Sequence, residues 1–200
     1  MGDHYYTAEP GSVRNVRSHK IEVLGVSLMM LTDTGVFSKD GLDEGSRLLL
    51  ETLPPLEGRV LDMGCGWGAI GLTLSLVNPG TWFILSDVNA RAIELCERNR
   101  RANALMNAQV FLSDGVASVE GEFDAVITNP PIRAGKKVIY RLFEEGFARL
   151  KPGGSLYVVI RKQQGAESAL AFLTGLSENA ERIARDKGFW VLKCGKDEGK

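Results

Sequence analysis

The stretch that decides the fold is Arg59-Val-Leu-Asp-Met-Gly-Cys-Gly-Trp-Gly68, a short apolar run that ends in alternating glycines. Residues 59–63 have the length and character of a buried strand, and the glycines after them permit a sharp turn with positive φ angles. Apolar residues then continue at helical length to Val77. A strand, a glycine turn and a helix in this order are typical of a parallel sheet that binds a ligand at its carboxyl edge.

The same alternation continues along the chain. The sequence predicts strands at 82–86, 109–112, 123–128 and 155–160, helices at 89–103, 135–150 and 166–176, and a closing pair of strands around 182–184 and 189–192. The turn Asp186-Lys-Gly188 joins the last two as a hairpin. This order predicts an α/β fold, a doubly wound Rossmann-like mixed sheet of about seven strands with a C-terminal antiparallel hairpin.

Upstream of the core, the pattern predicts two further units. Residues 1–19 are interpreted as a polar arm, and residues 20–57 as a small β extension that packs on the core 58–195. Within 20–57 we expect a hairpin that turns near Gly25, a loop punctuated by glycines and a helix that ends at Pro54-Pro55.

Composition excludes several classes of protein. The 200 residues carry a net charge of -1, which excludes a globally basic nucleic-acid binder but leaves room for a local basic patch. Three separated cysteines and two histidines predict no metal site and a reducing, cytoplasmic environment. The apolar run from Val23 to Leu31 is too short to span a membrane. The 23 glycines exceed the usual share of about 7% and indicate special backbone geometry.

Three acids follow consecutive strands at the edge where a ligand would lie. Asp62 precedes the first glycine by two residues, and Asp87 ends the second strand, where a carboxylate can accept from ribose hydroxyls. Asp114 ends the third strand, where it could accept from an adenine amino group. Gly64, Gly66 and Ala69 also fit a dinucleotide-binding turn, and a tight turn without any ligand is the simplest alternative.

A second motif, Asn129-Pro-Pro131, ends the fourth predicted strand. Pro130 and Pro131 have no backbone N–H to donate and fix the direction of the chain, while their own carbonyls remain available as acceptors beside the Asn129 side-chain oxygen. Two adjacent acceptors suit an amino group, which has two hydrogens to donate. The alternative is a rigid strand exit with no ligand.

Asp62-Met-Gly-Cys-Gly-Trp-Gly68 resembles the nucleoside-binding loop of class I methyltransferases that use S-adenosylmethionine. The resemblance implies that Asp62 and the loop face the methionine end of the cofactor, that Asp87 binds the ribose and that Asp114 binds the adenine. The complete set of implied cofactor residues is Asp62, Gly64, Cys65, Gly66, Gly68, Asp87, Val88, Asp114, Gly115 and Asn129.

Asn129-Pro-Pro-Ile132 resembles the Asn-Pro-Pro-aromatic signature of enzymes that methylate planar amino groups. The resemblance implies that Asn129 and the Pro130 carbonyl are catalytic and hold the target nitrogen. Ile132 departs from the signature because it can pack on a ring but cannot stack on it. Residues implied to contact the substrate are Pro131, Ile132, Arg133, Lys136, Lys137 and Phe37.

The chain is similar to the small-domain methyltransferase family over about residues 20–195. Two segments carry this resemblance: Gly35-Val-Phe-Ser-Lys-Asp-Gly-Leu-Asp43 and Asn129-Pro-Pro-Ile-Arg-Ala-Gly135. That family includes bacterial enzymes that methylate guanine N2 of small-subunit ribosomal RNA, and archaeal single-domain relatives. The resemblance implies methyl transfer to an exocyclic amine of RNA, with guanine N2 of small-subunit rRNA as the leading target.

Other functions remain open from the sequence. The same turn serves enzymes that methylate a protein glutamine or a DNA base, and the glycine loop would also suit an oxidoreductase of the NAD type. A non-catalytic RNA-binding protein is a further alternative. Arg133, Lys136, Lys137 and Arg141 carry four positive charges without an intervening acid, so they predict phosphate contacts or merely a solvated helix face. The oligomeric state is not predicted.

Overall fold

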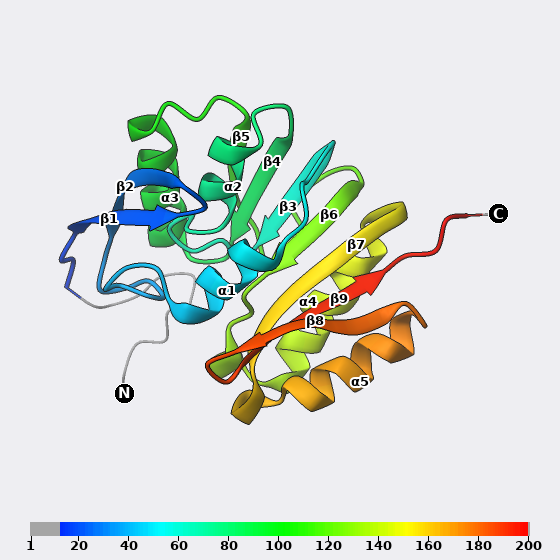
Figure 1. Ribbon diagram of the computed structural model, residues 1–200. Helices are drawn as coiled ribbons and strands as arrows, with labels where there is room; N and C mark the ends of the chain where they lie inside the picture. Colours follow the sequence, from blue (N-terminus) through cyan, green and yellow to red (C-terminus); the bar gives the residue numbers. More distant parts are fainter. Residues whose placement is uncertain (1–12, 200) are drawn as a thin grey trace.

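The computed structural model describes residues 13–199. Its main sheet has seven strands in the order β5-β4-β3-β6-β7-β9-β8, as Figure 1 shows. In chain order the strands are β3 (Arg59–Met63), β4 (Trp82–Asp87), β5 (Ala108–Leu112), β6 (Phe123–Thr128), β7 (Leu150–Arg161), β8 (Ala180–Asp186) and β9 (Phe189–Gly195). The first five are parallel, and β9 is antiparallel to both β7 and β8. The doubly wound mixed sheet is therefore confirmed.

Helices cover both faces of this sheet. They are α1 (Glu44–Thr52), α2 (Gly71–Val77), α3 (Ala90–Ala102), α4 (Lys136–Ala148) and α5 (Ala166–Leu176), with short 3-10 turns η1 (Ile132–Ala134) and η2 (Lys162–Gln164). Buried side chains of α1, α2 and α3 join one core cluster, and those of α4 and α5 join the other. Figure 1 shows the two helix layers on opposite sides of the strands. The carboxyl ends of the parallel strands are left accessible between these layers.

The N-terminal extension is a two-stranded antiparallel sheet of β1 (Arg17–Val23) and β2 (Val26–Thr32). Its inward side chains, such as Leu28 and Met30, are buried in the same cluster as α1, α2 and α3. The hairpin turns at Leu24 and Gly25, both at positive φ, as the sequence predicts. Strand β1 begins at Arg17, inside the arm expected at 1–19, and residues 1–12 of that arm lie outside the described part of the chain.

One strand is longer than the sequence indicates. Lys151-Pro-Gly-Gly154 suggests a break before a strand at 155, yet β7 already begins at Leu150. Leu150 pairs with Phe123, and the register shifts before Ala125 pairs with Ser155. Gly153 adopts a positive φ of 76° inside this irregularity, and its N–H donates to the Lys196 carbonyl at 3.0 Å. The glycines therefore bend the strand without ending it.

The closing hairpin follows the prediction. Lys187 and Gly188 between β8 and β9 both have positive φ, 45° and 80°, as a tight two-residue turn of the primed type requires. Within the described residues, no helix combines the length and the apolar character that crossing a bilayer would need.

Candidate active site

A cavity of about 290 Å³ lies at the carboxyl ends of β3, β4, β5 and β6, beside the start of α1. Its size is near the lower end for small-molecule sites. Most of the residues singled out from the sequence line it: Phe37, Gly64, Cys65, Gly66, Asp87, Val88, Asp114, Gly115, Asn129, Pro130 and Pro131. The topology therefore brings segments from four strand ends and the N-terminal loop into one site.

The glycine turn after β3 offers bare backbone to the cavity. Gly64 and Gly66 have positive φ angles of 77° and 56°, and a Cβ added to either would meet nothing within 4 Å. The turn is fixed to β4 because the N–H groups of Gly64 and Cys65 donate to the Ser86 carbonyl at 2.8 and 2.9 Å. Open space above a fixed glycine backbone is where a ligand can approach the main chain closely. Gly68 instead lies under the turn, where a Cβ would collide with Leu72.

Asp87 stiffens the same turn from β4. Its carboxylate accepts from the N–H of Gly66 at 2.9 Å and from the N–H of Asn89 at 2.8 Å. Burial raises its pKa above the ordinary value, and these backbone donors oppose that shift. Because Asp87 also lines the cavity, one carboxylate both orders the glycine turn and faces the ligand space.

Asp62, which the resemblance assigns to the methionine end of the cofactor, is not part of the cavity wall. It is 1% exposed, does not line the cavity, and its Oδ2 accepts from the Gly71 N–H at 2.8 Å beneath the turn. Its Oδ1 is buried and has no hydrogen-bond partner among the described residues. Burial raises the pKa of Asp62 to about 7, and the charge of Asp87 adds to that shift. Asp62 therefore anchors the start of α2, and its second carboxylate oxygen has no partner among the described residues.

The adenine-side acid belongs to an ion-pair network. Asp114 accepts from Arg141 of α4 at 2.7 Å, and Arg141 also donates to Glu145 at 2.7 Å. Arg141 lines the cavity, so it is directed away from the basic segment in which the sequence grouped it. Gly115, with φ of 56°, leaves room for this network, since a Cβ there would lie 1.9 Å from Glu145 Oε2. Asp114 remains 61% exposed at its side chain.

The loop between β2 and α1 closes one side of the cavity. Trp67 is 2% exposed and donates from Nε1 to the Phe37 carbonyl at 3.0 Å. Asn89 caps α3 and donates from Nδ2 to the Gly35 carbonyl at 2.9 Å. These two bonds hold the loop over the turn, with Phe37 40% exposed at the cavity wall.

The Asn-Pro-Pro segment presents two acceptors with no bonded donor among the described residues. Asn129 Nδ2 donates to Ser46 Oγ at 3.0 Å and makes a longer contact, 3.5 Å, with Asp43 Oδ1. Only the amide nitrogen can donate to a carboxylate, so this contact fixes the rotamer and leaves Asn129 Oδ1 as the free end. The Pro131 carbonyl accepts from the Ala134 N–H at 2.8 Å, whereas the Pro130 carbonyl accepts no bond within residues 13–199.

Four expected substrate residues lie outside the cavity wall. Ile132 packs against the core cluster under α4, while Arg133, Lys136 and Lys137 are exposed beside it. Ile132, which occupies the aromatic position of the signature, therefore does not contact the cavity as the aromatic would. Phe37, from the opposite side, is the aromatic that reaches the cavity.

Sequence reasoning missed several residues that build the site. Ser46 and Asn89 are buried polar residues within or at the start of helices, and Trp67 supplies the contact to Phe37 described above. For Arg141 the sequence predicts phosphate contacts or a solvated helix face, but not its contacts with Asp114 and Glu145. Asp43 is recognisable as a helix cap, since it accepts from the N–H groups of Gly45 and Ser46 at 3.0 and 3.1 Å. Its contact with the Asn129 amide nitrogen could not be predicted, because the two residues lie far apart in the sequence and meet only in the folded chain.

Comparison with known proteins gives a consistent family signal. The family model described as Methyltransferase small domain matches residues 27–193. The Bacillus subtilis protein YbxB, which is uncharacterized, is 38% identical over 98% of this chain and 100% of its own length. Ribosomal RNA small subunit methyltransferase C of Shewanella amazonensis is 34% identical over 84% of this chain and 50% of its own length.

A solved structure matches closely in fold. The T. thermophilus 16S rRNA N2 methyltransferase RsmC, in complex with AdoMet and guanosine, superposes with a TM-score of 0.81 at 28% identity. The match covers 94% of this chain and 52% of that one. The chain thus spans about half the length of the rRNA methyltransferases it matches.

Proposed function

The chain belongs to the methyltransferase small domain family, and we propose that it methylates an exocyclic amine of RNA. Its cofactor is S-adenosylmethionine, which decides against the dinucleotide that the glycine turn also allowed. The proposed target is guanine N2 of small-subunit rRNA, because the T. thermophilus relative is named as a 16S rRNA N2 G1207 methyltransferase and covers 94% of the chain. The Shewanella relative, named as a small-subunit rRNA methyltransferase, supports the rRNA part of this proposal.

The residues present fit this cofactor. The open glycine backbone at Gly64 and Gly66 provides a cradle, and the half-buried Asp87 and the exposed Asp114 supply acceptors at successive strand ends. The Oδ1 of buried Asp62, which has no hydrogen-bond partner among the described residues, is a further acceptor that a donor on the cofactor would satisfy. We expect the turn to hold the methionine end, Asp87 the ribose and Asp114 the adenine.

The single observation that carries the target class is the pair of unengaged acceptors, Asn129 Oδ1 and the Pro130 carbonyl. They are adjacent in the chain, line the cavity and have no bonded donor among the described residues. An –NH2 group would satisfy both with its two hydrogens. A hydroxyl, with one hydrogen, would leave one acceptor without a donor.

When bound, the cofactor supplies an electrophilic methyl group on a sulfonium sulfur. An exocyclic amine is a poor nucleophile because its lone pair is delocalised into the ring. Asn129 Oδ1 and the Pro130 carbonyl, by accepting its two hydrogens, would orient that lone pair toward the methyl group. Positioning of this kind can contribute up to roughly 7–11 kcal/mol in favourable cases. In this scheme the amine nitrogen would take the methyl group as its bond to sulfur breaks, the electron pair of that bond would stay on the sulfur, and the methylated amine would then lose a proton to solvent.

Asp43 and Ser46 act as positioning residues in this scheme. They hold the Asn129 nitrogen at the start of α1, so that its oxygen is the end offered to the substrate. Asp43 is itself fixed by its two capping bonds, which ties the amide to the rigid helix terminus. Phe37 offers an apolar surface for the target base on the loop side.

The test is methyl transfer from radiolabelled S-adenosylmethionine to protein-free small-subunit rRNA and to intact small subunits. We expect label in the RNA fraction, and its loss when the RNA is digested by ribonuclease before the reaction. Label that survives ribonuclease and follows protein would favour a glutamine target instead. Equal incorporation into duplex DNA would contradict the RNA assignment.

A further inference from the structure

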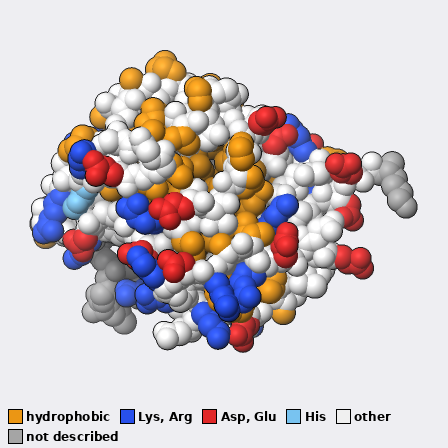
Figure 2. Space-filling model, viewed as in Figure 1, with side chains coloured by type: hydrophobic (Ala, Val, Ile, Leu, Met, Phe, Trp, Pro, Cys, Tyr) orange, Lys and Arg blue, Asp and Glu red, His pale blue; other side chains and the backbone are white. Residues whose placement is uncertain are grey.

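Seven cations gather where the sheet ends beyond the cavity, and we call them the basic rim. They follow three strands at the same edge: Arg133, Lys136 and Lys137 after β6, Arg161 and Lys162 at the end of β7, and Arg185 and Lys187 at the β8–β9 turn. Figure 2 shows Lys and Arg side chains concentrated at the lower part of this face, where Figure 1 places η2 and that turn. All seven residues are exposed.

Strand register places the rim next to the target-amine acceptors. Thr128, which directly precedes Asn129, pairs with Val158 of the neighbouring parallel strand. Arg161 is three residues further along β7, so it extends roughly 10 Å beyond that level at about 3.3 Å per residue. Arg161 in turn pairs with Phe189, the first residue after the hairpin turn. The rim therefore continues outward from the Asn129 side of the cavity.

Most of the rim charge is not neutralised. Lys162 approaches Glu167 at 3.7 Å and Lys187 pairs with Glu44 at 2.8 Å. The other five rim cations have no acidic partner within residues 13–199. By contrast, Arg141 at the adenine side contacts two carboxylates. The protein thus has a net charge of -1 and still keeps unpaired positive charge at one edge.

Two rim side chains are also held in place by aromatic rings. The Arg161 guanidinium lies 4.9 Å from the centre of the Phe189 ring, and Lys136 Nζ lies 5.1 Å from that of Tyr140. Contacts of this kind limit the motion of a long side chain before it meets a partner, which lowers the entropic cost of binding. Cations that are both ordered and free of acids are suited to bind anions repeated along a chain.

We propose that the basic rim binds backbone phosphates of the RNA next to the target nucleotide, with Arg161 and Arg185 as its outer contacts. The proposal rests on the RNA methylation proposed above and adds a surface on β7, β8 and β9 to it. Contacts to phosphate position a nucleic acid without reading its sequence. The rim would therefore determine affinity for RNA, while the cavity selects the base.

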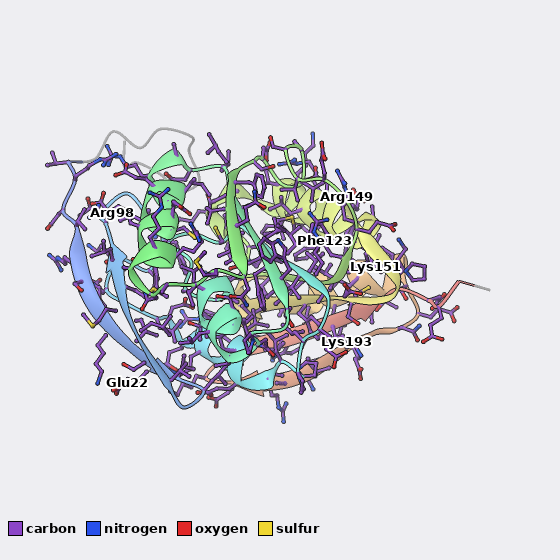
Figure 3. All side chains as sticks on the ribbon, turned by 90° about the horizontal axis from the view of Figure 1, so that it is seen from above. Glu22, Arg98, Phe123, Arg149, Lys151 and Lys193 are labelled. Carbon is purple, nitrogen blue, oxygen red and sulfur yellow. The ribbon has the colours of Figure 1, made fainter. Side chains whose placement is uncertain are left out.

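The test compares two matched double variants. Arg161→Gln/Arg185→Gln removes two rim charges, and Arg98→Gln/Lys193→Gln removes two charges elsewhere that also lack an acidic partner in the described part of the chain. Figure 3 shows Arg98 on α3 and Lys193 near the opposite end of the sheet, with Lys151 and Arg149. Binding of protein-free small-subunit rRNA is measured at several salt concentrations, and S-adenosylmethionine affinity and melting temperature report folding.

For the rim variant we expect about tenfold weaker rRNA binding at low salt and a slope of log K against log salt that is smaller by about 1 to 2. Its S-adenosylmethionine affinity should be unchanged, and the control variant should bind rRNA like the wild type. Equal losses in both variants, or none in the rim variant, would overturn the proposal while leaving RNA methylation intact. No rRNA binding by the wild type in any salt would overturn both proposals.

Discussion

The two halves of the cavity edge are built by different means. The β3-β4-β5 half is made of glycine backbone and carboxylates that are engaged by N–H groups or by Arg141. The β6-β7-β9-β8 half offers the acceptors Asn129 Oδ1 and the Pro130 carbonyl, bordered by the basic rim. Within residues 13–199, neither acceptor has a bonded donor and five of the seven rim cations have no acidic partner. Apart from Asp62 Oδ1, the first half is satisfied internally, whereas the second half keeps acceptors and cations that have no partner within residues 13–199.

That difference separates two tasks within one sheet. A small cofactor can be held by a preformed turn whose groups are already ordered. A polymer substrate must instead be placed by groups that remain available at the surface. Substitutions in one half should therefore alter cofactor affinity, and those in the other should alter turnover or RNA binding.

The largest effect is expected from Asn129→Ala. Loss of the acceptor and of its tie to Ser46 should lower kcat by on the order of 10²- to 10³-fold, the size typical for a preorganised hydrogen-bonding group. Single-turnover methyl transfer measures it, and calorimetry should find S-adenosylmethionine binding nearly intact. Asn179→Ala, at an exposed turn, is the matched control. Near-normal turnover in Asn129→Ala would break the assignment of the second half to the substrate.

Asp87→Ala should produce the opposite profile. Removing a carboxylate that orders Gly66 and faces the ligand should weaken S-adenosylmethionine binding by on the order of 10- to 100-fold, as for hydrogen bonds to charged groups. At saturating cofactor, turnover should recover most of its value. Calorimetry and kcat at high cofactor measure this split, with exposed Asp186→Ala as the control. A large loss of kcat at saturating cofactor would contradict the assignment of the β3-β4-β5 half to cofactor binding alone.

Ser46→Ala tests positioning within the substrate half. The variant loses the 3.0 Å bond that orients Asn129, and a bond of this kind corresponds to about a three- to tenfold drop in kcat. The KM for S-adenosylmethionine should not move. Thr52→Ala, which removes a hydroxyl bonded to Leu48 in the last turn of the same helix, controls for a general effect on α1. Equal effects of the two variants would show that Ser46 is only structural.

The smallest effect on activity is expected for Asp62 in the cofactor half, whose ionisation should appear instead as a pH dependence of stability. Because burial raises its pKa from 3.8 to about 7, the folded state retains a proton that the unfolded state releases. Stability should then fall as pH rises between about 4 and 7 and stay level above that range. In Asp62→Asn this contribution disappears, so its melting temperature relative to wild type should rise over the same range. Three pKa units correspond to about 4 kcal/mol, which is roughly 10 °C for a chain of this size. A pH-independent difference would contradict the buried, protonatable state of Asp62.

Much of this architecture was predictable from local sequence. Hydrophobic pattern and turn chemistry were sufficient to predict three features, because each depends on a short stretch of sequence. These are the order of strands and helices, the Lys187-Gly188 hairpin turn and the glycine turn. The early start of β7 was not, because its pairing with β6 overrides a Pro-Gly-Gly signal that would otherwise indicate a break. Pairing between strands distant in sequence decided that boundary.

The site divides in the same way. The wall residues Asp87 and Asn129 follow from their places at strand ends, which a parallel sheet brings together. The orientation of the Asn129 amide depends on Ser46, 83 residues away, and so needed the fold. Asp62 and Ile132 carry the right motif, yet their side chains turn to the interior. A motif specifies position along the chain more reliably than the direction of a side chain.

The most direct test of the account is the identity of the methylated nucleoside. Small-subunit rRNA would be methylated with deuterium-labelled S-adenosylmethionine, digested to nucleosides and separated by mass spectrometry against standards. We predict that the label is found in N2-methylguanosine, and that Asn129→Ala abolishes this signal. Label in a ribose-methylated or ring-nitrogen-methylated nucleoside, or none in RNA, would contradict the central claim that the two free acceptors hold an exocyclic amine.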